Sequence, residues 1–256
     1  MDLFYKQYGE EGPPLLILHG LLGASGNWHT LSRTTFQDVA RVYAVDQRNH
    51  GRSPHTDHMD YPTMAADVQA FVDDNGLTGT TLLGHSMGGK TAMQAAFAHP
   101  DTVERLIVVD MAPKAYPPRH EGLLAALDRI DPTAFDDREA IDDALAEDVP
   151  SRPIRQFLLK NLEYDGERYT WGMNLDAIQA HYDHINAALP RDATFSGPTL
   201  IVRGGRSDYV ADEDLPRMRD QFPDSRVVTI DKAGHWVHAD APSAFADAVM
   251  EFLQTT

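Results

Sequence analysis

Apolar and polar positions follow two alternating patterns along the chain. Short, nearly continuous apolar runs, typical of strands buried on both faces of a parallel sheet, occur at residues 15–20, 41–46, 80–84, 106–110, 198–204 and 226–230. Residues 4–8 alternate weakly, which predicts an edge strand. The pattern therefore predicts one sheet built from most of the chain length.

Amphipathic segments lie between these runs. In residues 61–75 the apolar side chains Met64, Val68, Phe71 and Val72 are spaced i, i+4, i+7 and i+8, which places them on one face of a helix. Further helices are predicted at residues 28–40, 91–98, 213–222 and 242–253. The alternation of strand and helix predicts an α/β fold with a mostly parallel central sheet and helices on both faces.

The rhythm changes between residues 112 and 191, where no convincing buried strand occurs. Three apolar stripes predict amphipathic helices, and Asp165-Gly166 predicts the turn of a short hairpin over residues 162–171. The stripes are Leu123, Leu127 and Ile130; Ile154, Phe157, Leu158 and Leu162; Ile178, Tyr182, Ile185 and Leu189. We expect a single domain over residues 1–256, with a core of residues 1–111 and 192–256. A helical cap of about residues 112–191 is inserted before the last two strands and lies over the carboxyl edge of the sheet.

The stretch Gly84-His85-Ser86-Met87-Gly88 joins a predicted strand to a predicted helix. Small flanking residues allow the sharp turn that exposes a serine Oγ, and the following helix directs its N-terminal N–H groups toward that serine. The pentapeptide alone is weak evidence, because a plain glycine-rich turn has the same pattern. In its context it indicates a nucleophilic serine.

Other candidates also follow predicted strands, and ligands of open α/β sheets bind outside the carboxyl ends of the strands. A serine needs a base and a carboxylate that orients the base. His235 is the candidate base, and Asp110 or Asp208 is the candidate carboxylate. The oxyanion would be bound by the N–H groups of Leu21 and Met87.

Four motifs carry a resemblance to a known family. They are His19-Gly20, Gly84 to Gly89, Gly234-His235-Trp236, and Asp46-Gln47-Arg48-Asn49-His50-Gly51-Arg52-Ser53. Over essentially its whole length the chain resembles an α/β-hydrolase, and the last motif resembles that of a branch of small esterases and acyl-thioesterases, in which Gly-His-Ser-Met-Gly-Gly-Lys also recurs.

The resemblance implies a serine esterase or thioesterase that cleaves small to medium acyl esters through an acyl-serine intermediate and needs no cofactor. In this branch the triad carboxylate follows the strand after the nucleophile, which favours Asp110, whereas many members of the superfamily use the position of Asp208. Two alternatives stay open. One is another activity of the superfamily, such as C–C bond hydrolysis or a cofactor-free perhydrolase, and the other is a ligand-binding receptor with little turnover.

Several polar residues near the motifs have structural as well as functional interpretations. Arg48 and Asn49 either order their loop or line the site and bind substrate, and Trp236 is predicted to pack beside His235 and bind substrate. His19 and His85 are predicted to shape the loop and pack beneath the serine turn rather than transfer protons.

Three further histidines raise the question of a metal site. His50, His55 and His58 have i, i+5, i+8 spacing on a loop that contains proline, which matches no common set of ligands. We therefore predict no metal.

Composition narrows the partners. The chain has 256 residues, no Cys, and a formal charge of −17, which argues against nucleic acid or an anionic membrane as partner. The first residues lack the long apolar segment of a signal peptide, which predicts a cytoplasmic protein. An acidic, Lys-poor surface suits a salt-adapted protein, and an ordinary acidic protein fits equally well. The oligomeric state stays open.

Overall fold

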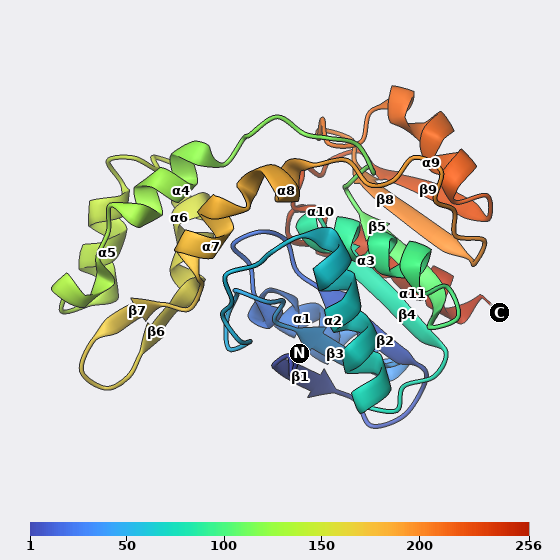
Figure 1. The fold of residues 1–256 in the computed structure, drawn as a ribbon, viewed down its shortest axis with the longest axis horizontal. Coiled ribbons are helices and arrows are strands. Elements are labelled where there is room, and N and C mark those ends of the chain that lie inside the picture. The colour runs from blue at the N-terminus through green and yellow to red at the C-terminus, as the bar shows by residue number, and fades with distance from the viewer. Residues whose placement is uncertain (256) are drawn as a thin grey trace.

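Residues 1–255 are described by a computed structural model, in which the apolar runs pair into one seven-stranded sheet (Figure 1). The order across the sheet is β1-β3-β2-β4-β5-β8-β9. The strands are β1 (Tyr5–Tyr8), β2 (Pro14–Leu18), β3 (Arg41–Val45), β4 (Thr80–His85), β5 (Val103–Val109), β8 (Thr199–Gly204) and β9 (Ser225–Ile230). Strand β1 runs antiparallel to β3, and every other neighbouring pair is parallel.

The alternation of side chains along each strand divides the core into two layers. One face of the sheet packs against α2 (Tyr61–Asp74) and α3 (Met87–Ala98), and the other packs against α1 (His29–Thr34) and α11 (Pro242–Gln254). Leu16 and Leu82 belong to the first layer, whereas Ile17 and Leu83, their neighbours in sequence, belong to the second. The prediction of a mostly parallel central sheet with helices on both faces is confirmed.

Two predicted helix boundaries are wrong. The segment predicted as one helix over residues 28–40 is broken into η1 (Ser25–Trp28), α1 and η2 (Phe36–Asp38). The break falls at Thr34 and Thr35, where two adjacent β-branched residues disfavour the helix and the Thr34 hydroxyl donates to the Thr30 carbonyl at 2.8 Å. Helix α3 begins at Met87 rather than at Thr91, so its N-terminus directly follows Ser86.

Between β5 and β8 the chain leaves the sheet and builds a lobe of helices, drawn at the left of Figure 1. Its elements are α4 (Glu121–Asp128), η3 (Pro132–Ala134), α5 (Arg138–Leu145), α6 (Arg152–Leu158), η4 (Leu159–Asn161), β6 (Leu162–Tyr164), β7 (Tyr169–Trp171), α7 (Leu175–Ala180) and α8 (Tyr182–Asn186). Strands β6 and β7 pair as a hairpin. The stripe from Ile178 to Leu189 does not form one helix, because α7 and α8 are separated at His181 and Leu189 lies beyond α8.

Strand β8 is followed by η5 (Asp212–Asp214) and α9 (Leu215–Gln221), and β9 is followed by α10 (Val237–Asp240). Helix α9 packs Met218 against Ile201 of β8. Ser86, Asp110 and His235 follow the carboxyl ends of β4, β5 and β9, which brings residues far apart in sequence to one edge of the sheet. In the part of the chain that the structure describes, no helix has the length and apolarity to span a membrane.

Candidate active site

Ser86 occupies a strained turn between β4 and α3. Its backbone has φ 55° and ψ −119°, a region that residues other than glycine rarely adopt. The flanking glycines are required by close contacts. A Cβ on Gly84 would lie 2.1 Å from the Gly88 carbonyl oxygen, and a Cβ on Gly88 would lie 2.3 Å from that of Leu18. The sequence motif is therefore explained by the packing of this turn against β2.

Ser86, His235 and Asp110 form one chain of hydrogen bonds. The Nδ1 atom of His235 lies 2.8 Å from Oδ2 of Asp110, and its Nε2 atom lies 3.0 Å from Oγ of Ser86. Because a carboxylate only accepts, Nδ1 carries the proton and donates it to Asp110. The bare Nε2 then accepts from the serine hydroxyl, which is the protonation state that a general base needs.

Asp110 is fully buried, and its carboxylate is held by further donors. Oδ1 accepts from the Gly204 N–H at 3.0 Å, and Oδ2 accepts from the Ser207 hydroxyl as well as from His235. Asp208, the alternative carboxylate, has a 74% exposed side chain and pairs with Arg119 at 2.5 Å. Its hydrogen bond to Arg119 holds the pKa of Asp208 below its usual value. The structure thus brings Asp110, and not Asp208, against His235.

Two rings enclose the His235 imidazole. Tyr209 stacks on it with ring centroids 3.6 Å apart and planes 15° apart. On another side, His85 donates its Nε2–H to the His235 carbonyl at 2.9 Å, and burial together with His235 and His238 holds the pKa of His85 well below its usual value. His85 is therefore a neutral packing residue, as the sequence predicts.

Tyr209 and Ser207 were missed by sequence reasoning. Both follow β8 within the loop that drew attention through Asp208, but neither belongs to a recognised motif. The signal that could have found Ser207 is a hydroxyl at the carboxyl end of β8, which neighbours β5 and so lies beside Asp110.

The two predicted oxyanion donors both lie beside Ser86. Met87 opens helix α3, and Leu21 follows β2 in a loop whose Gly20 lies against the serine: a Cβ on Gly20 would be 3.2 Å from that of Ser86. Within residues 1–255, neither the Leu21 N–H nor the Met87 N–H donates to a backbone or side-chain acceptor. Both groups are thus free to bind a negatively charged oxygen.

A cavity of about 680 Å³ opens in front of Ser86 and His235, between the sheet edge and the helical lobe. Trp236 lines it, with its ring centroid 5.3 Å from that of Phe157 in α6. Apolar side chains from both parts of the chain complete the wall: Leu31, Leu123, Ile154 and Phe157. His120 also lines the cavity, and burial lowers its pKa to about 4. Trp236 thus lines the same cavity as His235, and its contact with substrate stays a prediction.

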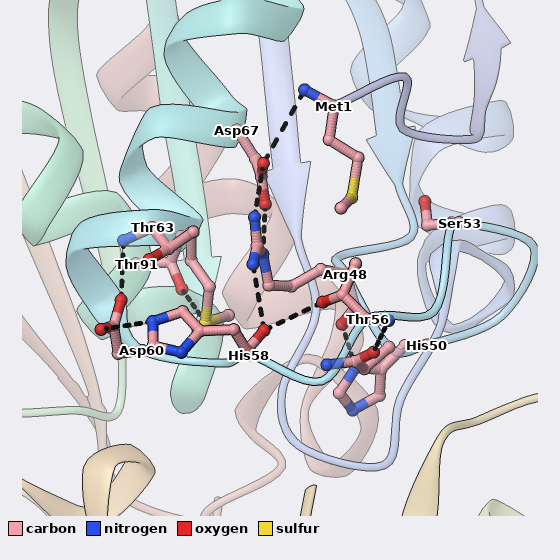
Figure 2. Close-up of polar contacts among 12 residues, drawn as sticks. Met1, Arg48, His50, Ser53, Thr56, His58, Asp60, Thr63, Asp67 and Thr91 are labelled. Carbon is pink, nitrogen blue, oxygen red and sulfur yellow. Dashed lines mark hydrogen bonds and ion pairs between the residues drawn. The ribbon is translucent and has the colours of Figure 1, made fainter. Parts of the chain in front are cut away.

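Arg48 and Asn49 do not line the cavity, so the prediction that they contact substrate is not supported. Nε and Nη2 of Arg48 donate to the two carboxylate oxygens of Asp67 in α2, at 2.6 and 2.9 Å (Figure 2). Asn49, with φ 63°, accepts from the Thr56 N–H at 2.7 Å. Both residues order the loop, which is the other interpretation that the sequence allows.

His50 and His58 of this loop have separate partners. The buried His50 bonds to the backbone of Leu22 and Arg48, and His58 pairs with Asp60 at 3.0 Å. Within residues 1–255, no three or more His, Asp or Glu side chains come together as metal ligands do.

Comparison with known proteins identifies the class. Residues 13–242 match the family described as alpha/beta hydrolase fold, and the chain belongs to that family. It is also similar to a solved structure described as a marine microorganism esterase, with 41% sequence identity and a TM-score of 0.94 over 98% of this chain and 99% of that one.

Relatives with named activities narrow the class further. The chain is 42% identical to the sn-1-specific diacylglycerol lipase ABHD11 of Mus musculus over 94% of this chain and 81% of the mouse protein. It is 33% identical to esterase YbfF of Escherichia coli over 94% of this chain and 92% of that protein. The prediction of a carboxylic-ester hydrolase is confirmed: this chain is an enzyme of the esterase branch of the family.

Proposed function

We propose that the chain hydrolyses small-molecule acyl esters through an acyl-serine intermediate, with Ser86 as nucleophile, His235 as general base and acid, and Asp110 as the carboxylate that orients His235. The observation that carries this proposal is the unbroken chain of hydrogen bonds from Asp110 through His235 to Ser86, at 2.8 and 3.0 Å. The N–H groups of Leu21 and Met87 would bind the oxyanion. No step needs a cofactor.

The steps follow from the positions of these atoms. Oγ of Ser86 attacks the acyl carbon while its proton passes to Nε2 of His235, and the carbonyl oxygen becomes an oxyanion. When the tetrahedral intermediate collapses, the alcohol or thiol leaves with the proton from His235. Water then attacks the acyl-serine and gives a proton to His235. When this second tetrahedral intermediate collapses, His235 returns the proton to Oγ of Ser86 and the acid is released.

Two cavities that share Ser86 suggest how an ester lies in the site. Ser86 and Leu21 line both the large cavity and a small one of about 20 Å³, whereas His235 lines only the large cavity and Met87 only the small one. Tyr61, Met111, Tyr116 and Ile185 are among the other residues that line the small cavity. The leaving group must reach His235, so we place it in the large cavity and the acyl group in the small one, which has room for a group about the size of one water molecule or methyl.

Esters of short acids with bulky apolar alcohols or thiols are thus the favoured substrates. A panel of acetate esters with lengthening alcohols, beside ethyl esters with lengthening acids, tests this orientation. Activity that grows along the first series and falls along the second supports it, and the reverse trend would place the acyl group in the large cavity. Thioesters of the same acids, included in the panel, measure the preference between ester and thioester.

The lobe of about residues 112–191 acts in this proposal as a cap that closes the large cavity. We also keep a cytoplasmic location and the absence of nucleic-acid partners as predictions.

One experiment separates the catalyst from its rivals. The protein is treated with a fluorophosphonate probe and, in parallel, with p-nitrophenyl esters. Rapid labelling at Ser86 with many turnovers supports the esterase. A single slow turnover supports a ligand-binding receptor, and labelling without ester hydrolysis directs attention to C–C bond hydrolysis or perhydrolysis.

A further inference from the structure

Two buried histidines form hydrogen bonds to the two peptide units that flank Leu21. Leu21 lies between two peptide units, Gly20–Leu21 and Leu21–Leu22, and the first of them carries the N–H assigned to the oxyanion. The loop is not held in a relaxed conformation: Leu22, which is 1% exposed, has φ 58°, a left-handed conformation that is costly for a side chain with a Cβ. Side-chain contacts must therefore hold it.

His19 fixes the first peptide unit. Its Nδ1 lies 2.8 Å from the Gly20 carbonyl oxygen, which also accepts from the Gly23 N–H at 3.0 Å. In a planar trans peptide the C=O and N–H point in opposite directions, so two donors on the Gly20 carbonyl fix the direction of the Leu21 N–H. The Nε2 atom of His19 accepts from the Gln47 N–H at 3.0 Å, which anchors the ring to the loop after β3.

His50 fixes the second peptide unit. Its Nδ1 lies 3.0 Å from the Arg48 carbonyl, which only accepts, so Nδ1 carries the proton and the bare Nε2 accepts from the Leu22 N–H at 3.2 Å. Burial, followed by the charge of His19, lowers the pKa of His50 to about 3, so the ring stays neutral near pH 7. The His19 and His50 rings contact each other, with centroids 5.0 Å apart.

Asn161, from η4 of the helical lobe, holds the same residue from the other side. Its Nδ2 donates to the Leu22 carbonyl at 2.8 Å, and its side chain is buried. Leu22 is thus bonded at its N–H by the loop after β3 and at its carbonyl by the lobe. This contact links the seating of the lobe to the conformation of the oxyanion loop.

We propose that His19, His50 and Asn161 form a brace, here called the Leu21 brace, whose role is to aim the Leu21 N–H at the substrate's carbonyl oxygen. The three are positioning residues, since none of the contacts that define the brace involves Ser86 or His235. The inference rests on the proposed function, because it assigns the brace to the oxyanion site of that esterase. It also gives the Asp46 to Ser53 motif a purpose: Gln47 and Arg48 supply the backbone groups that set both imidazoles.

The test compares two asparagines that join the lobe to the core. Asn161→Leu removes the bonds to the Leu22 and Leu158 carbonyls. The control Asn174→Leu removes bonds to Asn49 and Thr56 at 3.3 Å and the cap on the Ala177 N–H, and it leaves Leu22 untouched. For each variant we would measure kcat and KM on p-nitrophenyl acetate, melting temperature, and the affinity for a trifluoromethyl ketone. The adduct of that ketone with Ser86 places an oxyanion against Leu21 and Met87.

We expect Asn161→Leu to lower kcat about 10-fold and to lower the affinity for the ketone to a similar extent, while KM stays within about 2-fold of wild type. The reason is that a misaimed N–H donor acts on the transition state and not on ground-state binding. The control should keep kcat within about 2-fold at a comparable loss of melting temperature. His50→Leu should lower kcat about 100-fold. His50→Gln, which retains an acceptor for the Leu22 N–H, should recover part of that kcat.

Equal losses of kcat in Asn161→Leu and Asn174→Leu, or a loss confined to KM, would overturn the brace. If His50→Leu does not fold, the comparison of the two asparagine variants still tests the Leu21 brace. Wild-type turnover and labelling of Ser86 are measured first. Their absence would reject the proposed function, whereas normal wild-type turnover with unchanged kcat in the Asn161 variant would reject the brace alone.

Discussion

Replacing each candidate carboxylate by its amide gives the sharpest test of the catalytic triad. In Asp110→Asn, the buried side chain keeps its shape but presents an NH₂ group where Oδ2 now accepts from His235 and Ser207. If that NH₂ faces His235, Nδ1 must become the acceptor, and the imidazole proton moves to Nε2. The atom that should take the Ser86 proton is then already protonated.

The expected loss is large for one carboxylate and small for the other. A wrong tautomer costs up to about 10⁴ in kcat in a serine triad, equivalent to about 5 kcal/mol of transition-state stabilisation. Asp208→Asn removes only an exposed pair with Arg119, and surface pairs of this kind contribute little. We expect kcat for Asp208→Asn within about 3-fold of wild type.

The assay is kcat and KM for p-nitrophenyl acetate with both variants, alongside melting temperature to check that each folds. Asp208→Asn serves as the matched control, since it makes the same chemical change near the same site. A near-normal Asp110→Asn enzyme beside a crippled Asp208→Asn enzyme would refute the reasoning. Comparable partial losses in both would mean that the two carboxylates share the role.

Three further predictions concern the nucleophile, the charge and the buried histidines. Ser86→Ala, and likewise His235→Ala, should keep the fold and lose about 10⁶ in kcat; more than about a thousandth of wild-type kcat in either would reject the triad. If the charge of −17 is a salt adaptation, melting temperature should rise steadily through molar concentrations of potassium chloride. A matched sulfate series separates the screening of charges from the preferential exclusion of salt. A flat response would favour an ordinary acidic protein. Because the pKa of His50 is about 3 when folded and about 6.5 when unfolded, the unfolded chain takes up the proton first as pH falls below about 6.5. His50 should therefore cost up to about 1.4 kcal/mol of stability per pH unit between about 6.5 and 3, and urea unfolding at pH 7 and pH 5 should show a weaker pH dependence in His50→Gln; equal dependence would contradict this.

The centre of the sheet could be predicted because its strands are buried on both faces. Runs such as 15–18 and 106–109 contain no polar position that could face water, so no other placement was available to them. The ends of the helices could be predicted less well than the strands. The pattern over residues 28–40 has apolar positions that suit one helix, but the local bond between Thr34 and Thr30 and the β-branched pair at 34 and 35 end it early. Periodicity does not register that competition.

The catalytic serine and histidine could be predicted because each stands in a short motif directly after a strand. Asp110 and Asp208 could not be separated by position alone, since both follow strands. What separates them is burial: Asp110 is enclosed and receives the Gly204 N–H, while Asp208 points to solvent. Burial of a loop side chain depends on the path of neighbouring loops, and the sequence pattern does not record that path. Tyr209, which stacks on His235, was missed for the same reason.

The Asp46 to Ser53 motif allowed two interpretations, substrate binding or ordering of its own loop, and the contacts favour the second. Arg48 bonds to Asp67, and Asp46 accepts the N–H groups of Ser25 and Arg52 at 2.6 and 3.0 Å. Even Gly51 is explained by packing, because a Cβ there would lie 2.3 Å from an Asp46 oxygen. A motif that holds a loop at a fixed position beside the nucleophile restricts its residues as strictly as a motif that contacts substrate. The two cases differ in their response to mutation: a holding residue changes kcat through the Leu21 N–H, whereas a binding residue changes KM.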